Sequence, residues 1–318
     1  MLNRRDIKQL LRKKWQQGEY VKAISLFALI LIPAFLSLLL ILALLVRIGL
    51  FGSIPSSAEL EKIKNPVASE IYSKDGVLIG KYYQENRTNI SYDLFPGHLI
   101  DALVATEDVR FFEHGGIDWR SFMRVIFRTI LLGDRSGGGG STITQQLAKN
   151  LFGRRDLPLI GLPVNKMKEI YTARKLEKTY SKEEIIELYL NTIPFGHNFY
   201  GLEVAARRYF GKSASRLRME ESAVLVGMLK ANTYYNPARH PERAMNRRNT
   251  VLSQMSKYGY LMPAVGDSLQ TLPLETEFSL ENPATGRATH FRQLLKKKVE
   301  SLIENARKED GSRYRLEL

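Results

Sequence analysis

Glu107 occupies a position where the helical spacing of this sequence predicts an apolar side chain. It follows Ile100 by seven residues and shares a stripe with Leu103 on the helix expected there. Burying a carboxylate is costly unless it is paired, and burial raises its pKa toward the range in which a general base works near neutral pH. Glu107 is therefore a candidate general base, although a structural ion pair with Arg110 or His114 explains its position equally well.

The residues after Glu107 extend this pattern. Phe111 and His114 follow it by four and seven residues, so a helix that continues past Glu107 would place all three side chains on one face. Asp108 and Arg110 would flank that face. We therefore expect a functional site to be organised around residues 105–116.

A second glutamate, Glu169, shows the same anomaly. It lies on an apolar stripe with Ala173, Leu176 and Tyr180, at spacings of four, seven and eleven residues. Four cations surround it in the sequence: Lys166, Lys168, Arg174 and Lys175. A structural ion pair with Lys166, three residues earlier, explains this glutamate about as well as a functional role does.

Between the two glutamates, a polar helix is predicted to begin at Thr142. Thr142 and Gln145 fit a capping box, and Ile143, Leu147 and Leu151 form the expected buried face. The polar positions are Thr142, Gln145, Gln146, Lys149 and Asn150. Amides and a cation at a helix start suit a sugar-phosphate ligand, because hydroxyls and phosphate oxygens both need donors. A solvated helix face is the more common explanation of such a pattern.

Composition narrows the classes of protein. The 318 residues include no cysteine, which excludes disulfides and thiolate chemistry, and the five scattered histidines argue against a structural zinc site. A formal charge of +14 predicts an anionic partner, which could be nucleic acid, a membrane surface or a phosphorylated substrate.

An uncharged apolar run from Ala23 to Val46 is long enough to cross a bilayer core of about 30 Å. Lysines and arginines dominate residues 1–22, so the positive-inside rule predicts a cytoplasmic tail and a single pass through the cytoplasmic membrane. A buried helix of a soluble protein is the alternative. If the run crosses the membrane, everything after Arg47 is exported, which argues against a nucleic-acid partner.

The chain beyond the apolar run is predicted to be mainly α. A linker over residues 47–66 precedes a β-hairpin from Glu70 to Tyr83, which turns around Lys74-Asp75-Gly76. Further helices are expected at Ile117–Leu132, Lys182–Leu190, Glu203–Phe210, Glu220–Lys230 and Asn246–Tyr258. The first of these carries a stripe of Arg120, Arg124 and Arg128, which fits anionic headgroups or a solvated face. Glycine-rich residues 133–140 should be mobile.

Five segments occur in a characteristic order: Glu107 to Gly116, Gly139 to Asn150, Lys166 to Glu169, Glu187 to Asn191, and Arg247 to Leu252. They read Glu-Asp-x-x-Phe-x-x-His-x-Gly, Gly-Gly-Ser-Thr-Ile-Thr-Gln-Gln-Leu-Ala-Lys-Asn, Lys-x-Lys-Glu, Glu-Leu-Tyr-Leu-Asn and Arg-Arg-Asn-x-Val-Leu. Together they closely resemble the five motifs of the peptidoglycan glycosyltransferases, the glycan-polymerising domains of class A penicillin-binding proteins and their monofunctional relatives. The resemblance covers roughly residues 67–260.

This resemblance implies a lysozyme-like, mainly helical domain with a head lobe and a membrane-embedded jaw lobe. The implied substrates are lipid II and the nascent glycan chain, which acts as donor in forming a β-1,4 linkage with release of undecaprenyl pyrophosphate. Glu107 matches the general base of the family, and Glu169 matches its second functional glutamate. Matching substrate-binding positions are Asp108, Phe111, His114, Ser141, Thr142, Gln145, Gln146, Lys149, Asn150, Lys166 and Lys168.

Two implications of the resemblance are less direct. Family members are often stimulated by Mg²⁺ or Mn²⁺, but no ligand cluster in this sequence indicates a fixed metal site. Asn165 stands where the third motif of the family usually begins with Arg. Arg154, Arg155, Lys166 or Lys168 could compensate for the missing charge on the phosphates.

Residues 261–318 are expected to form a linker toward a transpeptidase domain, because Ala288 to Asn305 resembles the segment that precedes that domain in bifunctional proteins. No Ser-x-x-Lys occurs in the 318 residues, so the penicillin-reactive nucleophile is absent and a truncated bifunctional protein is expected. Two other classes fit parts of the pattern: a lysozyme-like enzyme that cleaves glycan, and an inactive membrane scaffold for other cell-wall synthesis proteins.

Overall fold

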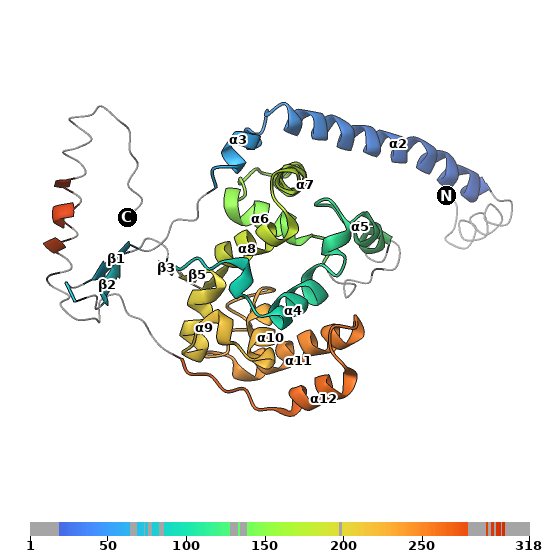
Figure 1. The fold of residues 1–318 in the computed structure, drawn as a ribbon. Coiled ribbons are helices and arrows are strands. Elements are labelled where there is room, and N and C mark those ends of the chain that lie inside the picture. Colours follow the sequence, from blue (N-terminus) through green and yellow to red (C-terminus); the bar gives the residue numbers. More distant parts are fainter. Residues whose placement is uncertain are drawn as a thin grey trace, which may run out of the picture. The chain divides into compact units, whose positions relative to one another are not determined.

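The computed structural model describes residues 19–63, 69–72, 74–75, 78–82, 86–127, 133, 139–196, 199–278, 291, 294–295, 297–299 and 301–302. The chain divides into two compact units, which are described separately. Residues 1–54 and 155–171 form the first unit, and residues 55–154 and 172–318 form the second. The fold is mainly helical with short strands, as predicted (Figure 1).

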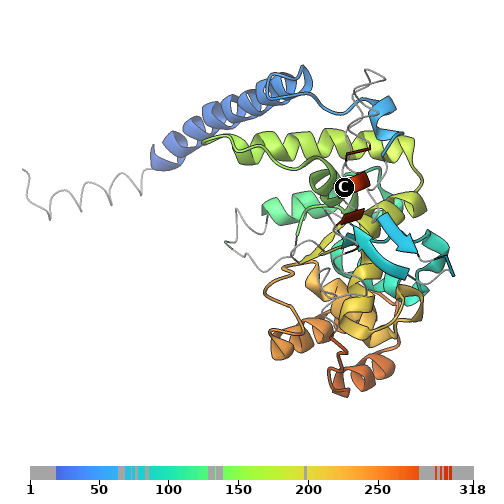
Figure 2. The same cartoon turned by 90° about the vertical axis from the view of Figure 1, so that its left-hand side faces the viewer.

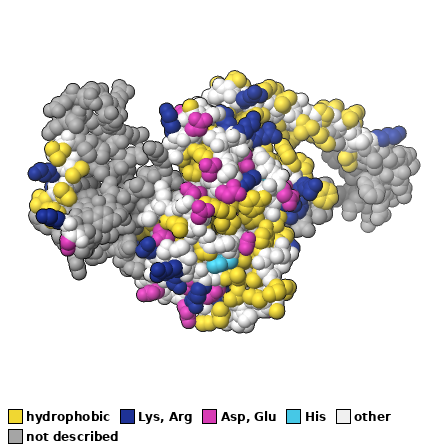
Figure 3. Space-filling model, viewed as in Figure 1, with side chains coloured by type: hydrophobic (Ala, Val, Ile, Leu, Met, Phe, Trp, Pro, Cys, Tyr) yellow, Lys and Arg dark blue, Asp and Glu magenta, His cyan; other side chains and the backbone are white. Residues whose placement is uncertain are grey.

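The first unit contains the long helix α2 (Glu19–Arg47), which Figure 2 shows in blue as one uninterrupted helix. Its apolar side chains are exposed, with Leu29 at 70% and Leu38 at 62%, and they form a yellow band in Figure 3. By length and composition this helix could cross a membrane, in agreement with the predicted span. The basic residues before Glu19 lie outside the described residues.

The second segment of this unit contains the first part of α7 (Gly161–Thr179). The Tyr171 hydroxyl donates to the carbonyl of Ala43 at 3.3 Å, and Lys168 Nζ donates to the carbonyl of Phe51 at 3.4 Å. These two hydrogen bonds tie α7 to the end of α2 and to the connection that follows it.

The second unit begins with the short helix α3 (Ser57–Leu60), which lies inside the predicted linker. Ser56 and Glu59 form its capping box, and Leu60 is fully buried. The Tyr180 hydroxyl donates to the Leu60 carbonyl at 2.5 Å, and Lys175 Nζ donates to the Pro55 carbonyl at 2.7 Å. This part of the connector is therefore packed onto the helical body.

The predicted hairpin is confirmed. Strands β1 (Ser69–Tyr72) and β2 (Leu78–Tyr82) pair antiparallel, with Glu70 opposite Lys81 and an irregularity between Ile71 and Tyr72. A second small sheet was not predicted. Its order is β3 (Asn86–Arg87), β5 (Phe199–Tyr200) and β4 (Pro194–Gly196), and β3 pairs parallel with β5.

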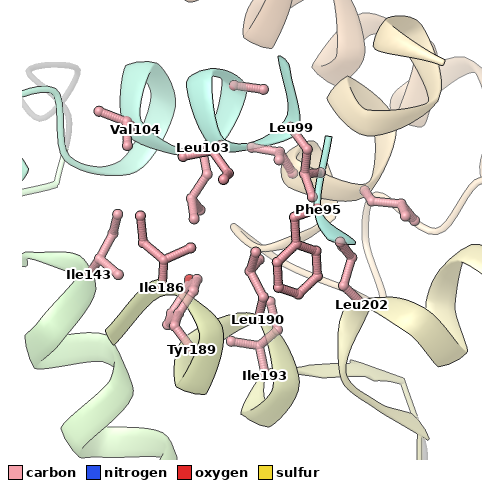
Figure 4. Close-up of a cluster of buried hydrophobic side chains, with 14 of the residues drawn as sticks. Phe95, Leu99, Leu103, Val104, Ile143, Ile186, Tyr189, Leu190, Ile193 and Leu202 are labelled. Atoms are coloured by element: carbon pink, nitrogen blue, oxygen red, sulfur yellow. The ribbon is translucent and has the colours of Figure 1, made fainter. Parts of the chain in front are cut away.

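The core of the second unit lies between helices that come from distant parts of the chain. Its helices are α4 (Gly97–Glu107), α6 (Ile143–Phe152), α8 (Lys182–Thr192), α9 (Leu202–Phe210), α10 (Met219–Met228) and α11 (Pro241–Lys257). Figure 4 shows Leu99 and Leu103 of α4 facing Ile186 and Leu190 of α8. Helix α10 is buried from Ser222 through Met228, which makes it the central helix of this unit.

The predicted helices are present, one begins earlier than predicted, and one further helix occurs. Helices α8, α9 and α10 begin and end within two residues of the prediction. Helix α11 begins earlier than predicted because Pro241 occupies its first turn, where a missing N–H costs nothing. Helix α12 (Pro263–Thr271) was not predicted.

Helix α5 (Trp119–Ile126) begins where Asp118 caps it, inside the predicted range. Arg128, residues 134–138 of the glycine-rich loop and most of Ala288 to Asn305 lie outside the described residues. The expected mobility of that loop and the resemblance of that C-terminal segment therefore remain predictions.

The helix expected to continue past Glu107 does not do so. Helix α4 ends at Glu107, and Asp108 leaves helical geometry with φ −158° and ψ 76°. A 3₁₀ turn, η2 (Phe111–Glu113), follows. The interpretation of Glu107, Phe111 and His114 as one helical face is therefore wrong, because the Asp108 carboxylate accepts a hydrogen bond from the distant Ile143 N–H and the chain turns away.

Candidate active site

Glu107 is the last residue of α4, and its side chain is partly buried. Gln146 on α6 donates from Nε2 to Glu107 Oε2 at 3.0 Å. The other end of the same amide, Oε1, accepts a hydrogen bond from the Tyr189 hydroxyl at 3.0 Å. Neither predicted ion-pair partner holds this carboxylate: Arg110 binds Asp118, and His114 binds Asp108. Glu107 is thus bonded to a neutral donor, which leaves its charge available to take a proton.

Asp108 is 6% exposed and anchors the turn after α4. Its carboxylate accepts hydrogen bonds from His114 Nε2 at 3.0 Å and from the backbone N–H of Ile143 at 3.1 Å. Ile143 is the first residue of α6, where free N–H groups and the helix dipole favour a carboxylate. His114 Nδ1 accepts from the Gly116 N–H at 3.2 Å, so the proton of the neutral ring is on Nε2.

The start of α6 is fixed by the carbonyl of Gly116. Thr142 Oγ1 donates to it at 2.9 Å, and Gln145 Nε2 donates to it at 3.2 Å. The predicted capping box is therefore half right. Thr142 caps the helix by accepting from the Gln145 N–H, but the Gln145 side chain reaches Gly116 instead of the Thr142 backbone.

The predicted substrate-binding residues of this unit divide into two groups by burial. Asp108, Phe111, Thr142 and Gln145 are buried, and His114 is partly buried. Ser141, Gln146 and Asn150 are partly exposed, and Lys149 is exposed. The second group can reach a ligand directly, whereas the first supports the geometry of the site.

A network behind Phe111 was not predicted from the sequence. Lys182 Nζ donates to the His114 carbonyl at 2.6 Å and to Glu177 Oε1 at 2.9 Å, and it lies 4.2 Å from the centre of the Phe111 ring. Thr144 Oγ1 also donates to Glu177, at 2.5 Å. These bonds join α6, α7 and α8 beneath the turn that follows α4.

Residues of the fourth motif, Glu187 to Asn191, had no predicted role, but the structure shows what they bind. Asn191 donates from Nδ2 to the Ile90 carbonyl at 2.9 Å, and its Oδ1 accepts from the Ile90 N–H at 3.1 Å. Glu187 accepts from the Tyr92 N–H at 2.8 Å. Helix α8 thus holds the segment before α4 through Glu187 and Asn191. Through Tyr189 it also holds the amide of Gln146 beside Glu107.

In the first unit, Glu169 is 6% exposed and lies 3.4 Å from Lys166 Nζ. The ion pair expected as the structural explanation is therefore present. Burial lowers the pKa of Lys168, and repulsion from the nearby Arg155 lowers it further. Lys166 pairs with the buried Glu169 carboxylate, and Lys168 lies near Arg155, so this unit carries positive charge that favours an anionic ligand.

Asn165, which departs from the resembled motif, binds the backbone of Arg155 at both ends of its amide. Its Oδ1 accepts from the Arg155 N–H at 3.1 Å, and its Nδ2 donates to the Arg155 carbonyl at 2.8 Å. Asn165 thus fixes the backbone that carries the Arg155 guanidinium. Compensation for the missing arginine by Arg154, Arg155, Lys166 or Lys168 remains a prediction.

Metal ligands do not gather in the described part of the chain, where no group of three or more His, Asp or Glu side chains could hold an ion. Glu169 pairs with the Lys166 ammonium, whose positive charge repels a divalent metal. The described residues therefore do not fit a fixed Mg²⁺ or Mn²⁺ site.

The described helices hold one glutamate bonded to an amide and a second paired with a lysine. The sequence model of the family described as Transglycosylase matches residues 75–256, which include both glutamates. This chain therefore belongs to the transglycosylase family.

Relatives agree with this assignment. Penicillin-binding protein 1A of Aquifex aeolicus (strain VF5) is 42% identical over 245 residues, which cover 77% of this chain and 32% of that protein. Penicillin-binding protein 1A of Escherichia coli (strain K12) is 35% identical over 260 residues, covering 82% and 30%. The chain thus spans about a third of the length of these relatives. A 2.6 Å crystal structure of penicillin-binding protein 1A from Haemophilus influenzae is 24% identical, covers 79% of this chain and 26% of that one, and has a TM-score of 0.42.

Proposed function

We propose that this chain is a peptidoglycan glycosyltransferase that polymerises lipid II into β-1,4-linked glycan and releases undecaprenyl pyrophosphate. The observation that carries the proposal is the Glu107 carboxylate, bonded to Gln146 within the matched transglycosylase region. An amide donor holds a carboxylate in place without neutralising its charge, which suits a general base.

The proposed reaction uses this carboxylate to take the proton from the 4-hydroxyl of the acceptor sugar. The oxygen of that hydroxyl forms a bond to the anomeric carbon of the donor as the bond between that carbon and the pyrophosphate breaks. The pyrophosphate leaves with the electron pair, and Glu107 holds the proton. Ser141, Gln146, Lys149 and Asn150 are proposed to bind the sugars and phosphates, because their side chains reach solvent.

The proposed role of Glu169 differs from that of Glu107. It lies beside Lys166, with Lys168 and Arg155 in the same unit. A carboxylate paired with a lysine orients that cation, so this group suits stabilisation of the departing pyrophosphate. Stimulation by Mg²⁺ or Mn²⁺ remains a prediction, which polymerisation in the presence of a chelator would test.

The membrane helix and the substrate fit one another. We propose that α2 anchors the chain in the cytoplasmic membrane as a single pass with a cytoplasmic N-terminus, because basic residues precede the apolar run. The domain after it would then act on a lipid-linked substrate outside the membrane. Lipid II and the nascent glycan are thus the proposed partners.

Incubation of the purified chain with labelled lipid II tests the function. The proposal expects glycan polymer. Glycan fragments from added peptidoglycan would indicate a cleaving enzyme instead, and unchanged substrate would indicate an inactive scaffold.

Exchange of the glutamates tests their roles. Glu107→Gln should lower the rate at least about 10²-fold, the low end for loss of a general base, and erase the acidic limb of the pH-rate profile. Glu169→Gln should lower turnover but retain that limb. Glu113→Gln is the matched control, since this exposed glutamate lies six residues beyond Glu107, and it should change little. A Glu107→Gln enzyme with the wild-type rate and limb would show that another group is the base.

A further inference from the structure

Tyr189 adjoins the site and has no role in the proposed reaction. It is 1% exposed, and Figure 4 shows its ring among the apolar side chains between α4, α6 and α8. Its hydroxyl is 3.0 Å from Gln146 Oε1, and Gln146 Nε2 is 3.0 Å from Glu107 Oε2. Three helices thus contribute one residue each to a chain of two hydrogen bonds that ends on the proposed base.

The direction of these bonds follows from the chemistry of an amide. A glutamine side chain can turn over and exchange its NH₂ and its oxygen, and only the NH₂ can donate to an ionised carboxylate. The oxygen facing Glu107 would instead repel the carboxylate. The Tyr189 hydroxyl has one hydrogen to donate, and Oε1 accepts it only when NH₂ faces Glu107. Turning the amide over would leave that buried hydrogen pointing at another donor, which is costly.

We propose that Tyr189 is a positioning residue that acts through Gln146, holding its amide with NH₂ toward Glu107 so that the amide donates to the carboxylate and aims it. This inference rests on the proposed function, in which Glu107 is the base.

The surroundings of Tyr189 support this role. Burial raises the pKa of Tyr189 well above its usual value, and the negative charge of Glu107 raises it further, so the hydroxyl keeps its hydrogen at working pH. Helix α8 is held at its start by the capping box of Ser181 and Glu184 and near its end by the bonds of Asn191 to Ile90. The ring therefore has a fixed place from which to direct the amide.

The titratable groups on the neighbouring elements are engaged elsewhere or exposed. On the segment after α4, Asp108 pairs with His114. On α8, Glu187 accepts from the Tyr92 N–H, and Lys182 binds Glu177 of α7. On α6, Lys149 is exposed. Gln146 is thus the group through which a change at Tyr189 would reach Glu107.

The first test measures the ionisation of Glu107 without relying on activity. The full chain in detergent is labelled with ¹³C at glutamate carboxyls, and the Glu107 signal is assigned by its loss in Glu107→Gln. Gln146→Leu removes the donor and should raise the titration midpoint of Glu107 by about one pH unit. Tyr189→Phe should raise it by about half a unit, because the amide can then turn over. The double variant should shift it no further than Gln146→Leu alone.

Tyr209→Phe is the matched control. Tyr209 is also buried, and its hydroxyl accepts from Asn236 Nδ2 at 2.9 Å, away from Glu107. The Tyr209→Phe variant should be less stable, as expected when a buried hydroxyl is removed, but the titration midpoint of Glu107 should be unchanged. A purely structural role for Tyr189 predicts this same result for Tyr189→Phe, and an unchanged midpoint in that variant would overturn the proposal.

The second test is the pH-rate profile of lipid II polymerisation. The acidic limb of Tyr189→Phe should move to higher pH together with the carboxyl midpoint. At pH values well below that midpoint, kcat should therefore fall about threefold. KM should change little, because Tyr189 is buried. A limb that stays in place while the midpoint moves would also overturn the proposal. Absence of polymerisation by the wild type would instead refute the proposed function, and the carboxyl titration would still decide the role of Tyr189.

Discussion

Gly116 is the position where a single added methyl group should do the most damage to the site. Its φ is +86°, which side chains rarely adopt, and a Cβ there would lie 3.1 Å from the backbone carbonyl of Ala173. The unfavourable backbone angle costs about 1–3 kcal/mol, and crowding against backbone that cannot move aside costs about another 1–3 kcal/mol. Gly116→Ala should therefore destabilise the domain by about 2–6 kcal/mol.

The neighbouring glycine provides the control. A Cβ at Gly115 would meet nothing within 4 Å, so Gly115→Ala should stay within about 0.5 kcal/mol of the wild type. Thermal unfolding of the full chain in detergent, followed by circular dichroism, should show a Tm lower by roughly 5–15 °C for Gly116→Ala only. Equal melting of the two variants would refute the argument from backbone angle and crowding.

Three further results are expected. Burial alone would raise the pKa of Asp118, but hydrogen bonds from Arg110 and Ser121 outweigh it and lower the pKa from 3.8 to about 2. A lowered carboxyl pKa stabilises the fold above 3.8, so about 2 kcal/mol should be lost as the pH falls from 3.8 to about 2, and denaturant unfolding of Asp118→Asn should lack this part of the loss. The chain should form no covalent penicillin adduct by mass spectrometry, and an adduct would reveal a nucleophile outside Ser-x-x-Lys. An impermeant thiol reagent should label Ser69→Cys but not Gln17→Cys in intact membranes, and labelling of position 17 would reverse the topology.

Periodicity predicted those parts of the fold that obey a local rule. The apolar stripe through Ala173 and Leu176 is buried, and Glu169 lies on it as expected. Helices α8 and α9 were placed to within two residues, because each has an apolar repeat and a clear end. Strands such as β3 and β5 have two residues each, which is too short for an alternating pattern to appear.

The errors at the site share a physical cause, since long-range hydrogen bonds override local preferences there. The helix past Glu107 was expected from spacing, but Asp108 bonds to Ile143, thirty-five residues away. The Gln145 side chain reaches Gly116, twenty-nine residues away, rather than closing a local capping box. Tyr189 lies on an apolar helix face, where sequence alone indicates an ordinary core residue.

The buried polar residues explain how Glu107 and Gln146, which are far apart in the sequence, are held beside one another. The Gly116 carbonyl accepts from both Thr142 and Gln145, and this sets the rotation at which α6 starts. Gln146 is the next residue, so the same rotation decides which way its amide points. Asp108, the residue after Glu107, accepts a hydrogen bond from the first N–H of α6. A shift at either end of this bond would therefore move the Gln146 donor and the Glu107 carboxylate apart. Loss of a buried residue such as Thr142 should therefore lower turnover even though it need not touch the substrate.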